Sequence, residues 1–330
     1  MATPINIKKH QREVARIQRQ LHAVNRAAVG EALVAIKASR IELRDELERI
    51  ILRHGSTSVQ AAHIRELLDA TDLVTARLNA RLRQGIEQHV RGMMGMGAER
   101  LPAELSAAGL RIELPGLDPL HVQFAQQYSM SLVQGVSASA RQQLHGVMFR
   151  AAMGQQTPWE AQLEIGRVLE TDPRRTHWGS IASQAERIYR SEGLRASNLS
   201  HAERMKQSST FLPGATKMWL HGGGGKDPRP EHRALHGKTV PVNSDFEWAD
   251  KKGLKYKAFG PHDSRLPASQ VVNCTCTVVL IPAGANEYDA TIGNRLADRE
   301  RARIAQDWQR SLEADLGIAR DAQNLEYYDV

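Results

Sequence analysis

The residues best suited to chemistry are two cysteines that lie one residue apart. Cys274 and Cys276 stand in the stretch VVNCTCTVVL and are the only cysteines among the 330 residues. Upstream, the stretch PEHRALHG places His232 and His236 four residues apart, so both imidazoles share one face if this segment is helical. Two thiolates and two imidazoles suffice for a tetrahedral zinc site, so zinc is a candidate cofactor.

Three interpretations of the cysteine pair remain open at the level of sequence. In the first, the two cysteines and His232 bind a metal, with His236, Asp227 or water as the fourth ligand. In the second, two reduced thiols pack as small side chains at the edge of a strand. In the third, Cys274 is a nucleophile with His232 as its base and Asp227 as the orienting group. A metal site requires the chain to bend between the cysteines, because Cys-x-Cys is tighter than the loops of common zinc fingers.

Composition restricts the classes of protein to consider. The net charge of +7 and the pI near 9.5 favour an anionic partner, either nucleic acid or an acidic protein face. No stretch of eighteen uncharged apolar residues and no secretory signal is seen, so we expect no membrane insertion and a cytoplasmic location. Two cysteines cannot form the disulfide framework of a small secreted domain.

Apolar periodicity and turn residues predict a mainly α protein with a small α+β module. We expect long N-terminal helices, a central helical region, short antiparallel strands near the Cys-x-Cys element and a C-terminal helical tail. Five segments follow: an N-terminal helical arm (1–92), a Gly/Pro linker (93–119), a helical part (120–212), the small module with both motifs (213–283) and the tail (284–330).

The arm is predicted to begin with a long amphipathic helix from Ile7 to Arg53, or with two nearly collinear helices, with a shift of phase near Gly30. Much of the excess positive charge lies here, and a candidate contact with nucleic acid or a partner consists of Lys8, Lys9, Arg12, Arg16 and Arg19. The simpler interpretation of these residues is a solvated helix face.

Later helices carry start signals of their own. We expect helices over about 120–152 and 179–205, and between them one that begins with a capping box in which Thr157 is the N-cap, Pro158 follows and Glu160 closes the box. Beyond Pro213, the runs KMWL, KTVPV and CTVVLIP predict short strands, and the stretch from Ser244 to Gln270 between the last two reads as a loop.

An ordered series of motifs over about residues 120–283 resembles the phage Mu F-like minor head protein family, also called the phage head morphogenesis domain. The series comprises YRSEGLRASN, a strand with a tryptophan, a glycine-containing turn, the H..LHG element and NCTCTV. Its residues with an implied structural role are Arg190, Glu192, Trp219, Asp227, Arg229, Gly237 and Asn273. Asn198, His232, Leu235 and the two cysteines complete the series.

The resemblance implies a virion component rather than an enzyme. Such a protein is a minor head protein near the portal vertex or capsid interior, acting in capsid assembly, DNA packaging or delivery. Its implied partners are the portal protein, other head proteins and packaged DNA, with no small-molecule substrate. Two alternatives from other classes are a metal-dependent or thiol hydrolase using His232, Asp227 and Cys274, and an internal DNA-binding protein.

Overall fold

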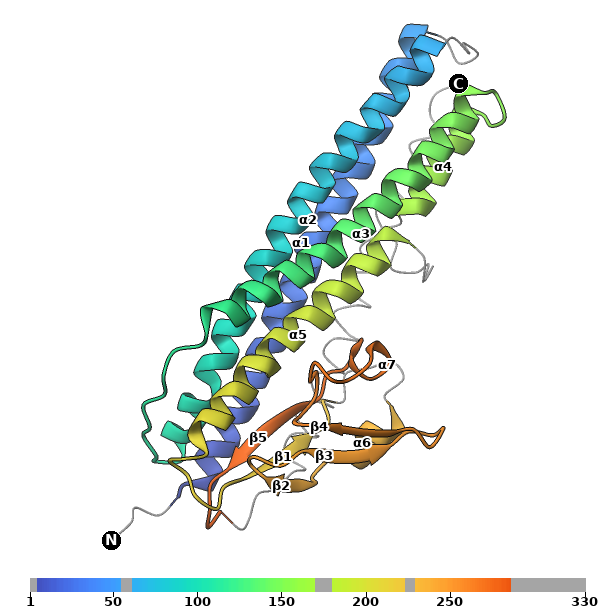
Figure 1. Cartoon of the computed structure of the whole chain (residues 1–330). Coiled ribbons are helices and arrows are strands. Elements are labelled where there is room, and N and C mark those ends of the chain that lie inside the picture. Colours follow the sequence, from blue (N-terminus) through green and yellow to red (C-terminus); the bar gives the residue numbers. More distant parts are fainter. Residues whose placement is uncertain (1–4, 55–60, 170–179, 223–228, 286–330) are drawn as a thin grey trace, which may run out of the picture.

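The computed structural model describes residues 5–54, 61–169, 180–222 and 229–285, and it confirms a mainly α fold with a few short antiparallel strands (Figure 1). In chain order the elements are α1 (Ile7–His54), α2 (Ala61–Ala107), α3 (Pro119–Ala152), α4 (Pro158–Leu169), α5 (Ile181–Ser208), β1 (Thr216–Leu220), α6 (Pro230–Ala234), β2 (Thr239–Pro241), β3 (Phe246–Ala249), β4 (Lys255–Ala258), α7 (Ala268–Val271) and β5 (Thr277–Ile281). None of the described helices is long and apolar enough to cross a membrane.

Helices α1 to α5 form an elongated bundle, in which α1, α2, α3 and α5 run side by side and the short α4 packs against α1 and α3 (Figure 1). Each helix contributes a row of aliphatic residues to one continuous core, such as Ile36 and Leu43 from α1 and Leu78 and Ile86 from α2. These side chains recur at helical spacing and are almost completely buried, so burial of apolar surface holds the bundle together.

The predicted N-terminal arm is therefore not a separate exposed element. Helix α1 is continuous through Gly30, and its apolar face packs against α2, α4 and α5. The second helix does not stop near residue 92, as the repeated glycines suggested, but continues to Ala107 with Pro102 inside it. A glycine is required at position 97 of this helix, since a Cβ there would lie 2.2 Å from the backbone oxygen of Ser197 on α5. The glycine permits close helix packing instead of ending the helix.

Residues 209–285, which we call the small module, contain both sheets. One sheet has the order β2-β1-β5 and is antiparallel, with Trp219 opposite Val278 and Lys217 opposite Leu280. The other is the hairpin of β3 and β4. The sequence analysis predicted a loop here, which is wrong. The two strands have only four residues each and contain charged side chains, so their strand pattern is weak. The predicted C-terminal helical tail falls from residue 286 onward outside the described residues.

The small module packs against one end of the bundle, and both faces of its β2-β1-β5 sheet contact bundle helices (Figure 1). Trp219 and Leu280 pack against the last turns of α2 and α5, while on the opposite face Met218 and Val279 contact Val14 of α1. Burial of both faces explains why β5 is buried throughout and apolar from Val278 to Ile281.

A buried polar cluster, which we call the junction, crosses this contact. The guanidinium of Arg100 on α2 donates to the Thr277 hydroxyl and, at 2.8 Å, to the carbonyl of Val278, and it pairs with Glu104 at 2.6 Å. His201 of α5 lies beside Glu104, and both side chains are fully buried. Burial raises the pKa of the Glu104 carboxyl, which the neighbouring Arg100 opposes. The junction thus ties two helices of the bundle to β5.

Candidate metal centre

Two segments of the small module carry the three donor groups of the candidate metal centre. His232 lies on the one-turn helix α6, and the two cysteines lie in the irregular segment between α7 and β5. Arg229 is the residue before α6, and its guanidinium donates to the carbonyls of Ser269 and Val272 at 2.6 and 2.8 Å. Arg229 therefore fixes α6 against the segment that carries the cysteines.

The three donor atoms converge in the protein interior. Nδ1 of His232 lies 3.5 Å from Sγ of Cys274 and 3.8 Å from Sγ of Cys276, and all three donors lie within 4.8 Å of one another. Their side chains are buried, and the cysteines form no disulfide. This group of three could hold a metal ion, because the three ligand atoms lie close enough together to bind the same ion.

The tautomer of His232 suits metal binding. Nε2 of His232 lies 2.8 Å from Oε1 of Gln270, and an amide oxygen only accepts, so Nε2 carries the proton. The lone pair of Nδ1 consequently faces the two sulfur atoms. Gln270 in turn donates to Glu231 at 3.3 Å, which orients its amide. A hydrogen-bonded outer partner of this kind is typical of metal-binding histidines.

The backbone turns sharply at the residue that precedes the two cysteines. Asn273 has a φ of 58°, in the left-handed region that asparagine tolerates better than most residues. Its N–H donates to the hydroxyl of Ser191 on α5, and the N–H of Cys274 donates to the carbonyl of Val271. Opposite the bend stands Gly222, where a Cβ would lie 2.0 Å from the Thr275 carbonyl oxygen. Both cysteines thereby turn toward His232.

The thiols influence each other through a hydrogen bond. The thiol of Cys276 hydrogen-bonds to Cys274, and this is the main cause that holds the pKa of Cys274 well below its usual range. Burial raises the pKa of the Cys276 thiol. Without a metal, the pair therefore carries its first negative charge on Cys274, a form that is ready to bind a cation.

Aromatic rings enclose the centre. Trp219 and Trp248 meet the imidazole of His232 edge to face, with centroids 5.4 and 5.9 Å away, and Phe246 packs against Trp219. These rings belong to the apolar core of the small module, together with both cysteines. Together with the burial of the three donors, these rings separate the centre from solvent.

The predicted fourth ligand does not join this group. His236 was expected to share a helical face with His232, but α6 ends at Ala234 and the chain turns at Gly237, whose φ is 81°. Nδ1 of His236 instead accepts the N–H of His221 at 3.1 Å. The substitute ligand Asp227 lies outside the described residues.

Three residues around the centre were missed by the sequence analysis. Gln270 orients His232, and His262 hydrogen-bonds through Nε2 to the carbonyl of Cys274 at 3.0 Å. His221 lies close enough to Cys274 and His232 for their charges to act on its pKa, which burial lowers. Only the residue types gave a signal, since no spacing links these positions to the cysteines.

Several residues of the ordered motif series converge on the cysteine segment. The amide of Asn198 on α5 donates to the carbonyl of Cys276 at 3.2 Å and accepts from the hydroxyl of Thr277 at 2.9 Å. The N–H of Gly237 donates to the carbonyl of Trp219 at 2.9 Å, which closes the turn after α6.

Two further residues of the series belong to the bundle. Glu192 is buried and accepts from Ser129 of α3, and burial raises its pKa. Arg190 pairs with Glu186, and its carbonyl accepts from Asn25 of α1. These contacts hold α5 in the bundle rather than at the metal centre.

The basic residues near the N-terminus lie apart from the metal centre. All five are exposed along α1, whose opposite face is buried: Lys8, Lys9, Arg12, Arg16 and Arg19. Arg16 pairs with Glu13 at 2.6 Å, as expected of a solvated helix face.

Comparison with known proteins identifies no relative. No family model, curated protein or solved structure matches this chain.

Proposed function

We propose that this protein is a minor head protein of the phage Mu F-like family. In this role it associates with the portal vertex or the capsid interior and acts in head assembly and in DNA packaging or delivery. The observation that supports the proposal is the convergence of the motif residues on the segment that carries the two cysteines: Asn198 and Arg229 donate to carbonyls of this segment, and Asn273 within it donates through its backbone N–H to Ser191 of α5.

A structural role agrees with the enclosure of the centre. His232, Cys274 and Cys276 are 2%, 3% and 3% exposed, so a macromolecular substrate cannot reach them. The residues of the motif series therefore serve to position a buried structural centre. A thiol hydrolase would need an open path from solvent to Cys274. Among the described residues, the rings of Trp219 and Trp248 pack against His232 beside this cysteine and cover it.

Zinc is the metal that the donor set favours. Two thiolates and a neutral imidazole match the soft and borderline ligands of structural zinc sites. When bound, zinc would link α6 to the segment before β5 and so close the small module. Among the described residues no fourth side chain joins these three donors, which leaves the fourth tetrahedral position to water or to a residue outside the described ranges.

Cobalt substitution tests the group of three donors. Co²⁺ bound to Cys274, Cys276 and His232 gives the visible absorption of a tetrahedral thiolate site. We expect His232→Ala to change this spectrum and to weaken Co²⁺ binding by at least about 10- to 100-fold, the loss that follows even the removal of an outer partner of a metal site. His236→Ala is the matched control, since His236 does not belong to the group. An equal change with both variants, or no change with His232→Ala, would contradict the assignment.

Association with head proteins tests the function itself. The full chain, tagged at its N-terminus, is expressed together with the portal protein and the other head proteins encoded in the same genome. We expect the portal protein to co-purify with it and to be retained after a high-salt wash. If purified head proteins are never retained, the proposed function is wrong, whatever the metal content of the protein.

A further inference from the structure

Helix α1 runs along the length of the bundle (Figure 1), and a row of cations follows it on the side away from the core. Five exposed side chains make up this basic row: Lys8, Arg12, Arg19, Arg26 and Lys37. Their intervals of 4, 7, 7 and 11 residues are close to one, two, two and three turns of an α-helix. The five cations therefore project from one side of α1, along a nearly straight line about 44 Å long.

The basic row differs from the set of basic residues that the sequence analysis named. Lys9 follows Lys8 directly, so it points about 100° away from the line of the row. Arg16 is paired with the carboxylate of Glu13 at 2.6 Å. Arg26 and Lys37, which the sequence analysis did not include, continue the line toward the middle of the bundle.

The positive charge of the basic row is not compensated by neighbouring carboxylates. Between its first and last residues α1 contains two acidic residues, Glu13 and Glu31, and both are turned away from the row by about 120°. Four of the five cations make no ion pair with any residue that the structure describes: Lys8, Arg12, Arg19 and Lys37. An anionic partner can therefore approach the row without displacing an internal ion pair of these four side chains.

Small residues lie between the cations of the row. Gly30 follows Arg26 by about one turn and is exposed in the middle of a helix, where glycine costs about 1 kcal/mol relative to alanine. No described atom lies within 4 Å of a Cβ built at Gly30, so internal packing does not require a glycine there. With the exposed Ala23, this glycine lets the backbone of a partner come close to the surface of α1.

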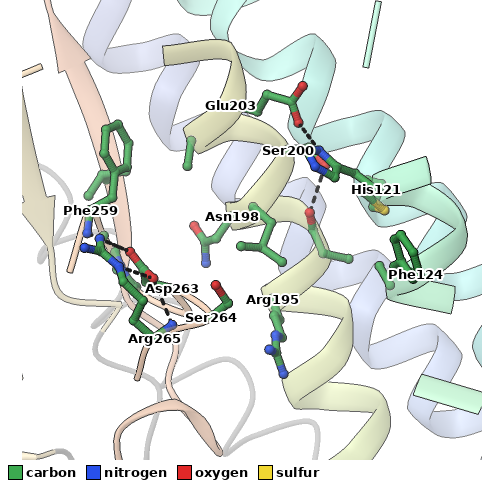
Figure 2. Close-up of a pocket in the computed structure, with 18 of the residues that line it drawn as sticks. His121, Phe124, Arg195, Asn198, Ser200, Glu203, Phe259, Asp263, Ser264 and Arg265 are labelled. Carbon is green, nitrogen blue, oxygen red and sulfur yellow. Dashed lines mark hydrogen bonds and ion pairs between the residues drawn. The ribbon is translucent and has the colours of Figure 1, made fainter. Parts of the chain in front are cut away.

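The cleft of about 920 Å³ between the bundle and the small module is a different kind of surface. Figure 2 shows Arg265 beside Asp263 and His121 beside Glu203. Arg265 lies 2.6 Å from Asp263 and 2.9 Å from Asp245, so its charge is already compensated. Four carboxylates line the cleft and would repel phosphates: Glu192, Glu203, Asp245 and Asp263. Of the two surfaces, only the basic row fits a polyanion.

We propose that the basic row binds double-stranded DNA through its phosphates. Cations separated by small residues match the polar, strongly positive surfaces that bind DNA, whereas the centre of a protein–protein interface is apolar and poor in charge. The row is as long as about 13 base pairs, so several of its cations reach phosphates of one duplex. This ligand deepens the proposed head function, on which the choice of DNA rests.

The salt dependence of DNA binding tests this proposal. A fluorescein-labelled duplex of about 20 base pairs is titrated with the purified full chain between about 50 and 200 mM salt, and its anisotropy is measured. With five phosphate contacts, the affinity of the wild type should fall by about 10²- to 10³-fold over this range. The row variant combines Arg12→Gln, Arg19→Gln and Lys37→Gln. It should bind at least tenfold more weakly at the lower salt concentration, and its slope of log affinity against log salt should be smaller by about 2 to 3.

A paired variant that combines Arg49→Gln, Arg53→Gln and Arg81→Gln is the matched control. It removes the same three charges from exposed positions, but each of these arginines already pairs with a carboxylate: Glu46, Glu66 and Glu42. Its slope should stay close to that of the wild type, because these side chains lie outside the row. Circular dichroism checks that both variants are folded.

Three results would overturn the proposal. The first is a wild-type chain that binds no duplex at the lower salt concentration, and the second is an equal loss in both variants, which would show an effect of net charge alone. The third is polyglutamate that competes with the duplex at equal charge concentration and loses affinity in the row variant, which would assign the row to an acidic protein. Because no head protein takes part in this experiment, its failure would leave the portal co-purification test of the head function unaffected.

Discussion

The bundle and the small module are stabilised in different ways. Helix α1 alone contributes a row of buried side chains from Ile17 to Ile50 to a continuous apolar core. The small module has described strands of three to five residues and one-turn helices, held by hydrogen bonds such as that of His232 with Gln270. The apolar core of the bundle is thus larger than that of the small module, where a metal bound at the candidate centre would add a further link.

This difference predicts that the two regions respond differently to the same kind of perturbation. Loss of a donor atom at the metal centre should unfold the small module and leave the bundle largely intact. A packing defect between α2 and α5 should instead act on the bundle and, through the junction, on the whole protein.

The largest expected effect is that of His232→Ala. Structural zinc contributes about 10–16 kcal/mol of binding free energy in zinc-finger peptides, so its loss should remove several kcal/mol from the stability of the small module. We expect hydrogen exchange of β1 and β5 to accelerate at least a hundredfold, while α1 to α3 keep their protection. Equal acceleration in both regions would show that the two are not separable in this way.

Gly97→Ala should have the next largest effect. The added Cβ would lie 2.2 Å from the backbone oxygen of Ser197, so α2 and α5 must separate, at a cost of about 3 kcal/mol in the free energy of unfolding. Gly95→Ala is the matched control, since nothing lies within 4 Å of a Cβ there. It should stabilise the protein by about 0.5–1 kcal/mol through helix propensity. Urea unfolding followed by circular dichroism measures both.

Acid should destabilise the bundle through its buried histidines. Burial lowers the pKa of both His10 and His89 to about 4, against an ordinary value of about 6.5. Between these values the unfolded chain binds protons that the folded chain does not, so stability falls as the pH falls. Each histidine should cost about 2 kcal/mol between about pH 7 and pH 5.

His89→Gln tests this pH dependence, because a glutamine keeps a donor for the Asn25 side chain, which lies 2.7 Å from Nε2 of His89. The free energy of unfolding of the variant, compared between about pH 7 and pH 5, should decrease less steeply than that of the wild type. An unchanged slope would mean that His89 is protonated in the folded protein.

Thr157→Ala should have the smallest effect. The N–H of Glu160 donates to the Thr157 hydroxyl at 3.2 Å, and the N–H of Thr157 donates to the Glu160 carboxylate at 2.7 Å. Loss of this capping box should cost about 1 kcal/mol, confined to α4. Thr157→Ser should restore it. A larger loss of unfolding free energy that also affects α5 would contradict this prediction. It would show that α4 contributes to the stability of the whole bundle.

The sequence predicted the bundle well where its signals were local. The rows of aliphatic residues, the capping box at Thr157 and the extent of α3 follow from helical period and turn chemistry. The error came at Gly97, because a glycine that allows close packing looks the same in sequence as a glycine that ends a helix. Only the position of α5 distinguishes the two.

The metal centre was predicted in part. His232 and the cysteines were found from their chemistry, yet His236 was chosen on the assumption of a helix that ends two residues earlier. Gln270 could not be predicted, since its contact with His232 depends on a fold that brings residues almost forty positions apart together. Likewise, Arg100 resembles an exposed cation in sequence and is buried in the junction.

The most direct test of the metal centre is the metal content of the purified full chain, measured by elemental mass spectrometry. The wild type is compared with Cys274→Ser together with Cys276→Ser, and with His236→Ala as a folded control. We predict about one zinc per wild-type and per control chain and none in the cysteine variant, in line with three donors within 4.8 Å. A wild-type protein that contains no metal after expression with added zinc would contradict the proposed zinc centre.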